Sequence, residues 1–208
     1  NRGRSPAGAS ARKIGMSTAA LLAELLSGED QRAEQAALAL AHKQPSALPE
    51  LYKLLESPDP EQRWWAIRAI AECEPAPQTS LYLLAALADD SSQVRQAAAL
   101  AFCHQPDPQA IPALIRALSD PNPLVASLAG NALTLLKADA LPRLMAALEN
   151  EQNPTARRGI VRSLAEIGDP IAIPSLMKAL ASDSALLQYW AEHGLEKMGL
   201  GMIYLKPS

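Results

Sequence analysis

The sequence predicts an all-α protein: a right-handed α-solenoid of about six helical hairpins. Three observations predict this fold. Ala and Leu, which favour helices, dominate the 208 residues, whereas the aromatic residues that favour strands are few, with one Phe, three Trp and four Tyr. Similar segments recur at a nearly constant spacing along the chain. Each segment holds two stretches of helical apolar periodicity with turn-forming residues between them.

The first helix of each repeat is predicted from five segments that begin alike. Their matching positions are spaced by 32, 31, 30 and 32 residues. Proline suits the first turn of a helix, where its missing N–H is not needed, and the Leu-rich pattern that follows supplies an apolar stripe. A looser unit from Thr18 to Pro45 begins the array. The matching positions, each one residue after the start of an expected helix, are Pro49, Leu81, Pro112, Pro142 and Pro174.

The second helix of each repeat starts about fourteen residues later, after a turn such as the one from Asp120 to Pro123. We name its first aligned residue the anchor position. Residues three and six positions after the anchor are small in nearly every repeat, and the residue seven positions after it is large and apolar. Close-packed helices require this pattern, so these positions are predicted to form the core. The anchors are Arg63, Arg95, Ala126, Arg157 and Gln188.

A single hairpin cannot bury its own apolar stripe, so the repeats are expected to stack as one solenoid over residues 16–208. Residues 199–208 are expected to fold back as a cap, and the alternative is that their apolar run from Met202 to Leu205 docks on a partner. Residues 1–15 are basic and rich in Gly, Ser and Pro, which predicts disorder. Met16 resembles a natural start, so this segment is expected to be an appended sequence, with a targeting remnant as the alternative.

The composition excludes several classes of function. Beyond the first fifteen residues the chain carries 15 basic and 22 acidic residues, and an acidic body argues against nucleic-acid binding. The apolar runs are far shorter than the ~18 residues of a membrane span. Cys73 and Cys103 form neither a disulfide framework nor a metal-ligand cluster, so no metal site is expected. A reducing compartment, the cytoplasm or a plastid stroma, fits these cysteines best.

Two motifs carry a family resemblance. The segment IPALIRAL at residues 111–118 and the segment RRGIVRSLAEIGD at residues 157–169 resemble HEAT repeats, and in particular the short HEAT-like repeats of phycobilin lyase proteins. The likeness covers residues 18 to 200. It implies a protein that handles a phycobiliprotein subunit or an open-chain tetrapyrrole, with the acceptor cysteine on the phycobiliprotein. Such lyases commonly pair two repeat proteins, so a second HEAT-repeat subunit is another implied partner.

The exposed side of the second helices is the predicted binding face. Positions one and five residues after the anchor lie opposite the core positions, on the side that lines the concave groove of such stacks. Arginine and aromatic side chains there are of the kind enriched in binding surfaces, and they suit bilin propionates and pyrrole rings. The predicted partner-binding residues are Trp64, Arg68, Gln96, Asn131, Arg158, Arg162, Tyr189 and His193.

A structural interpretation of the same residues stays open. Trp64 would pack against its neighbour, and the arginines would pair with Glu72 and Glu166 along a solvated helix face. Trp65 and Trp190 share one repeat position and are expected to pack at the edge of the core.

No catalytic residue is predicted. Cys103 and His104 are adjacent, but they close a helix, where the helix dipole disfavours a thiolate. Some phycobilin lyase-isomerases have a His-Cys pair in such repeats, and here the order is reversed. Lyase activity is therefore implied by the resemblance alone, and no cofactor is expected apart from an open-chain tetrapyrrole. The alternative function is a protein-binding scaffold with neither bilin nor catalysis.

Overall fold

The computed structural model describes residues 15–201. These residues form α-helices and short 3-10 helices, and no β-strand occurs among them, as the composition predicts. The helices belong to two compact units, Asn1–Gln105 and Pro106–Ser208, and we describe each unit on its own. The predictions for residues 1–14 and for the cap beyond residue 201 concern residues outside the described range.

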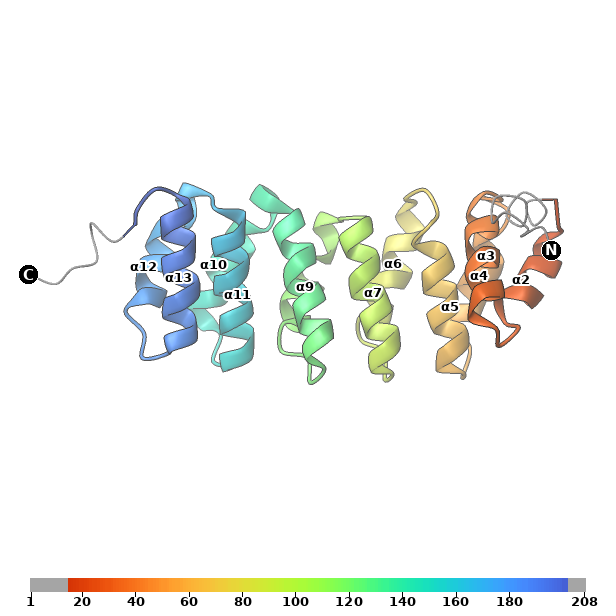
Figure 1. The fold of residues 1–208 in the computed structure, drawn as a ribbon, viewed down its shortest axis with the longest axis horizontal. Helices are drawn as coiled ribbons and strands as arrows, with labels where there is room; N and C mark the ends of the chain where they lie inside the picture. The colour runs from red at the N-terminus through yellow and green to blue at the C-terminus, as the bar shows by residue number, and fades with distance from the viewer. Residues whose placement is uncertain (1–14, 202–208) are drawn as a thin grey trace, which may run out of the picture. The chain divides into compact units, whose positions relative to one another are not determined.

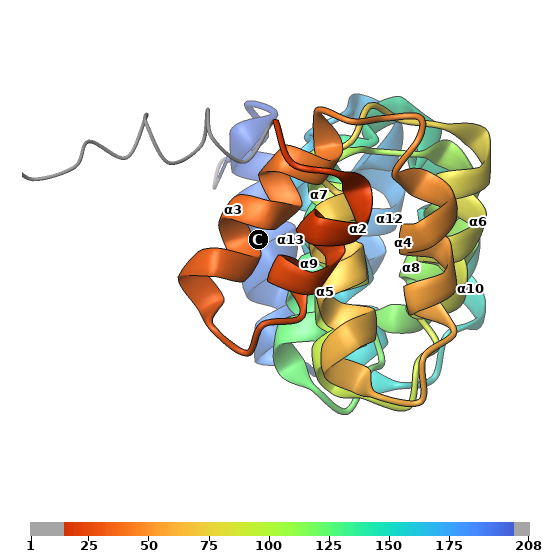
Figure 2. The same ribbon diagram turned by 90° about the vertical axis from the view of Figure 1, so that its right-hand side faces the viewer.

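Unit 1 contains three helical hairpins. The second helices α3, α5 and α7 pack side by side and form one layer. The first helices α4 and α6 form a second layer, which packs against the first (Figures 1 and 2). Helix α2 packs against α3, so the looser N-terminal segment also forms a hairpin, as expected. The helices are α2 (Thr18–Leu25), α3 (Asp30–Ala41), α4 (Leu48–Leu55), α5 (Pro60–Ile70), α6 (Pro77–Ala86) and α7 (Ser92–His104).

Unit 2 repeats the same plan. The second helices α9, α11 and α13 form one layer, and each packs against the first helix of its own hairpin. The helices are α8 (Ile111–Ala117), α9 (Pro123–Leu135), α10 (Leu141–Asn150), α11 (Pro154–Ile167), α12 (Ile173–Leu180) and α13 (Ala185–Lys197). Single 3-10 turns, Pro108–Ala110, Lys137–Asp139 and Pro170–Ala172, lead into α8, α10 and α12.

Proline or a side-chain cap fixes most helix starts, and the prolines at the starts of α4, α8, α10 and α12 are those predicted. The Asn153 Oδ1 atom, for example, accepts hydrogen bonds from the backbone N–H groups of Thr155 and Ala156 at 2.9 and 3.3 Å. One expected start was wrong. Helix α6 begins at Pro77, not at Ser80, because Pro77 already supplies the preset φ angle of a first helical residue.

The predicted core positions are confirmed in every second helix. In the five repeats, all residues three, six and seven positions after the anchor are buried. The phase of each second helix is therefore the predicted one, and the opposite face is exposed or half-buried. The buried residues are Ala66, Ala69, Ile70, Ala98, Ala101, Phe102, Ala129, Ala132, Leu133, Ile160, Ser163, Leu164, Ala191, Gly194 and Leu195.

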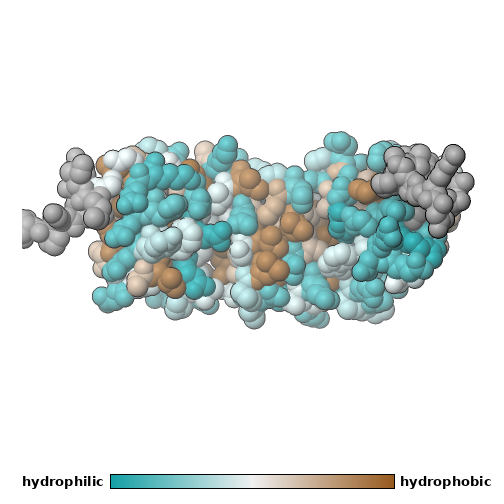
Figure 3. Space-filling model, viewed as in Figure 1, coloured by the Kyte–Doolittle hydropathy of each residue, from teal (hydrophilic) through white to brown (hydrophobic). Residues whose placement is uncertain are grey.

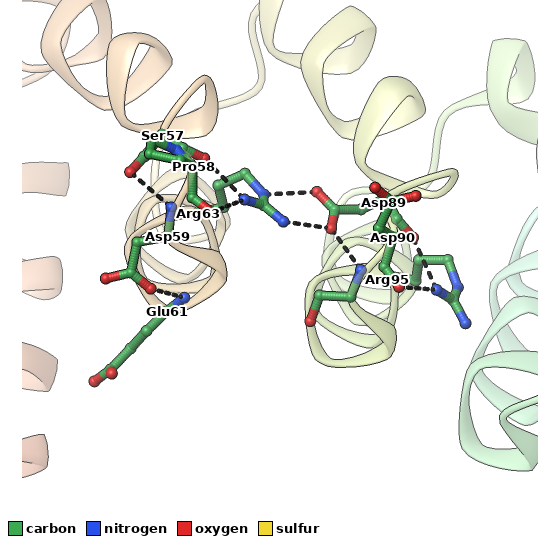
Figure 4. Close-up of polar contacts among 9 residues, drawn as sticks. Ser57, Pro58, Asp59, Glu61, Arg63, Asp89, Asp90 and Arg95 are labelled. Atoms are coloured by element: carbon green, nitrogen blue, oxygen red, sulfur yellow. Dashed lines mark hydrogen bonds and ion pairs between the residues drawn. The ribbon is translucent and has the colours of Figure 1, made fainter.

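Four of the five anchor residues, all except Ala126, hold the turn that precedes their own helix. Figure 4 shows the Arg63 guanidinium donating to the carbonyl oxygens of Ser57 and Pro58 at 2.8 and 3.2 Å, and to both carboxylate oxygens of Asp89. Arg95 donates in the same way to the backbone of Asp89 and Asp90. Arg157 and Gln188 also bind turn carbonyls. These side chains satisfy backbone acceptors that a helical hairpin would otherwise leave open.

Among the described residues, no single helix is long and apolar enough to cross a membrane. Residues 123–135 and 137–150 reach that length and composition only together, and a bend of 108° separates them.

Candidate functional site

The predicted binding residues all lie on second helices, and none of them is buried. They form two groups, one in each unit. The unit 1 group is Trp64, Arg68 and Gln96, and the unit 2 group is Asn131, Arg158, Arg162, Tyr189 and His193. Figure 3 shows mostly hydrophilic residues with scattered apolar ones over α11 and α13, where much of the unit 2 group lies.

Arg162 is the centre of the unit 2 group. Its guanidinium donates to the Ser127 hydroxyl at 3.4 Å and to the Asn131 amide oxygen at 3.1 Å, both on α9. It also lies over the Trp190 ring of α13, with 5.5 Å between its Cζ atom and the ring centroid. These three partners are neutral, so they orient the guanidinium without compensating its charge.

Trp190, which contacts Arg162, belongs to a group of three aromatic side chains on α13. Trp190 makes edge contacts with Tyr189 and His193, at ring-centroid distances of 5.2 and 5.8 Å. Tyr189 is 58% exposed, so its ring is available to a partner. Sequence reasoning placed Trp190 only at the edge of the core and did not select Ser127. The position of Ser127, one residue after the anchor, was the available signal.

The structural interpretation also pairs Arg162 with Glu166, and this pair does not form. Lys197 of α13 donates instead to the backbone carbonyl and the carboxylate of Glu166, and the His193 ring lies 3.8 Å from the same carboxylate. Glu166, which lies one turn after Arg162, is therefore paired with Lys197. Arg158 is exposed, and within residues 15–201 its side chain has no ion-pair partner. Among residues 15–201, these two guanidinium groups of unit 2 thus have no ion-pair partner, and one of them, that of Arg162, lies over Trp190 next to the exposed Tyr189.

In unit 1, a cavity of about 800 Å³ opens between the N-terminal ends of α3, α5 and α7. Trp64 packs edge-on against Trp65, with 4.7 Å between the ring centroids. Trp65 is only 6% exposed and belongs to the core, as expected. Trp64 therefore fits both interpretations, because it rests on its neighbour and also lines the cavity. The lining residues are Asp30, Gln31, Glu34, Glu61, Trp64, Trp65, Gln93 and Gln96.

Arg68 differs from the arginines of unit 2. It pairs with Glu72 on its own helix, as the structural interpretation predicted, and with Glu34 on α3. Burial alone would lower the pKa of Arg68, but the two carboxylates outweigh burial and raise it. This guanidinium therefore ties α3 to α5, and its charge is compensated within the protein.

Neither cysteine forms a disulfide, and the pKa of each thiol is raised. Burial is the main cause for each, and it raises the pKa of Cys73 to about 11. A thiolate is therefore scarce at neutral pH, as the sequence predicted for Cys103. No group of three or more metal-ligating side chains that could hold an ion occurs among the described residues.

We expect Cys73 to react with iodoacetamide at pH 8 more than about 100-fold more slowly in the folded protein than in guanidinium, because only the thiolate reacts. Mass spectrometry of tryptic peptides against time measures both rates. Cys103 serves as the internal comparison, since it is half-buried and should react faster than Cys73. Equal rates in the folded and unfolded protein would show that neither thiol is protected.

The repeat geometry has a match among known families. A family model described as HEAT repeats matches residues 18–91, 79–138 and 125–196. The chain belongs to the HEAT-repeat family. An engineered protein solved by the Northeast Structural Genomics Consortium has the same fold, with a TM-score of 0.53, 20% identity and coverage of 89% of this chain and 98% of that one.

Three curated proteins are similar to parts of this chain. The chain is 30% identical over 150 residues to "Uncharacterized phycocyanin operon protein Z" of Pseudanabaena tenuis, covering 68% of this chain and 73% of that protein. It is 41% identical over 93 residues to "Bilin biosynthesis protein RpcF" of Synechococcus sp. WH8020, covering 44% of each chain. It is also 39% identical over 79 residues to "Phycocyanobilin lyase subunit beta" of Nostoc sp. PCC 7120, covering 38% of this chain and 39% of that subunit. The expected likeness to phycobilin lyase proteins is confirmed.

Proposed function

We propose that this HEAT-repeat protein is a binding module of the phycobilin lyase type that holds a phycobiliprotein subunit on the exposed face of its second helices. The observation that carries the proposal is the uncompensated Arg162, oriented by Asn131 and Trp190 beside the exposed Tyr189. Exposed arginine and aromatic side chains are those that dominate binding energy in protein interfaces. The names of the curated relatives support the choice of a phycobiliprotein as partner.

The chemistry of the unit 2 group suits a carboxylate next to a flat ring system. Arg158 and Arg162 offer planar donor forks, which bind carboxylates with two parallel hydrogen bonds. Tyr189 and Trp190 offer ring surfaces for stacking. A bilin propionate with its pyrrole ring meets both requirements, and an acidic side chain of the subunit meets the first. A second HEAT-repeat subunit is the other partner we propose, since the lyase relatives are named as subunits.

Arg162→Ala is expected to weaken binding of an apo-phycobiliprotein subunit about tenfold and to lower the melting temperature only slightly, because its hydrogen-bond partners Ser127 and Asn131 are not buried and can bind water instead. Biolayer interferometry with the immobilised apo-subunit measures the affinity. Arg143→Ala is the matched control, an exposed arginine on α10 in the other layer of unit 2. An equal effect of both substitutions would refute a specific role for the second-helix face.

The second candidate is a scaffold that binds a protein and no bilin. The acidic lining of the unit 1 cavity favours it, since carboxylates repel bilin propionates. Mixing the protein with free phycocyanobilin, with and without the apo-subunit, separates the two functions. A shift of the visible absorption spectrum supports the lyase-type function, whereas binding of the subunit with no spectral change in either mixture supports the scaffold.

A further inference from the structure

We propose that the cavity of unit 1 binds an arginine side chain presented by a protein partner. The inference deepens the proposed function, and rests on it only in that a partner protein supplies the arginine. Three properties of the cavity carry it: uncompensated acidic groups, a half-buried tryptophan, and amide side chains around them. Unit 1 would then recognise a cation, whereas the unit 2 group suits a carboxylate.

The charge of the lining has one sign. Three of its side chains are carboxylates and none is basic. Glu34 is paired with Arg68, but within residues 15–201 the carboxylates of Asp30 and Glu61 have no hydrogen-bond or ion-pair partner. Two negative charges therefore share a concave site of about 800 Å³ whose lining, among the described residues, holds no cationic side chain. A guanidinium entering this site would reduce their mutual repulsion and gain charge-assisted hydrogen bonds.

The tryptophan selects for a flat cation. Trp64 lines the cavity, and its contact with the buried Trp65 fixes its ring. A guanidinium stacks on an indole face and donates in its plane at the same time, which an ammonium group cannot do. The amide oxygens of Gln31, Gln93 and Gln96 supply further acceptors for that plane. An arginine fits this combination better than a lysine.

The two free acids also have a structural role. Asp30 and Glu61 lie in the first turns of α3 and α5, where the helix dipole favours negative charge. This role by itself predicts no response of Trp64 to a cation. It is compatible with the proposed site, and a binding experiment separates a purely structural role from recognition.

The test uses the three tryptophan indole N–H signals of the full chain in a ¹H–¹⁵N NMR titration. The probe is N-acetyl-arginine amide, and N-acetyl-citrulline amide is the uncharged comparator of the same shape. We expect the arginine derivative to shift the Trp64 signal saturably, and citrulline to bind at least tenfold more weakly. The Trp64→Phe variant assigns the signal. An equal response to both compounds, or a response confined to Trp190, would overturn the proposal.

A double variant tests the acids directly. Asp30→Asn combined with Glu61→Gln is expected to weaken the arginine titration at least tenfold, and Glu149→Gln, an exposed acid on α10, is the matched control. Unchanged binding by the folded double variant would also overturn the proposal. The arginine–citrulline comparison on the natural sequence decides the matter where the double variant does not fold. Saturable arginine binding without any phycobiliprotein binding would keep the cavity inference and reject the proposed function, and the opposite result would do the reverse.

Discussion

Gly194→Ala is expected to lower the free energy of unfolding of unit 2 by about 3 kcal/mol, because α13 packs against α11 through this glycine. A Cβ atom at Gly194 would lie 2.7 Å from both the Cα and the Cβ of Ala165, and 3.0 Å from a methyl carbon of Leu176. The first of these neighbours is backbone, so no change of rotamer relieves the clash, and the two helices must separate. Urea unfolding followed by circular dichroism, with hydrogen exchange of the α13 amides, measures the loss.

Gly130→Ala is the matched control in the same unit. It also lies inside a second helix, α9, but its Cβ would meet only side-chain atoms of Leu118 and Ser163, each at 3.6 Å. That distance is an ordinary van der Waals contact, and alanine is favoured over glycine inside a helix by about 0.5–1 kcal/mol. We therefore expect Gly130→Ala to be neutral or stabilising. Equal stability of the two variants would show that α13 and α11 are not in the close contact described.

The fold could be predicted because the same pattern of core residues recurs in five repeats. A small residue six positions after the anchor is ambiguous in any single helix. Ala69, Ala101, Ala132, Ser163 and Gly194 together indicate a tightly packed position, and every one of them is buried. The start of α6 was predicted wrongly because the repeat alignment matched Leu81 with the prolines of the other repeats. This alignment ignored the local effect of Pro77.

The face of the candidate site could be predicted, but its contacts could not. Within one helix, Glu166 is the natural partner of Arg162, four residues away. In the structure, Arg162 bonds to Asn131 and Glu166 to Lys197, each 31 residues apart. A stack brings equivalent positions of adjacent repeats together, so contacts between repeats compete with contacts along the helix. A single sequence does not show whether the contact between repeats or the contact along the helix forms, because this depends on the spacing between the helices.

Arg63→Ala is expected to destabilise unit 1 by about 2 kcal/mol, since this side chain joins two hairpins. Its guanidinium bonds to both oxygens of Asp89 at 2.7 and 2.8 Å, and these side chains are only 15% and 13% exposed. Removing the arginine leaves a half-buried carboxylate and two turn carbonyls without their donor. Urea unfolding at pH 7 measures the change. Lys53→Ala is the control, because the Lys53–Glu50 pair is 70% and 44% exposed and should contribute nothing measurable.

The same pair makes this loss depend on pH. Burial would raise the pKa of Asp89, but the hydrogen bonds from Arg63 and from the Ser91 backbone outweigh burial and hold it below its ordinary value. A carboxyl whose pKa is lowered by folding contributes stability that is present above its unfolded pKa of about 3.9 and is lost as the pH falls through the folded value. The destabilisation by Arg63→Ala should therefore be full at pH 7 and clearly smaller at pH 3. A constant difference across this range would show that Arg63 acts only through the carbonyl oxygens of Ser57 and Pro58, and that its pairing with Asp89 contributes nothing to stability.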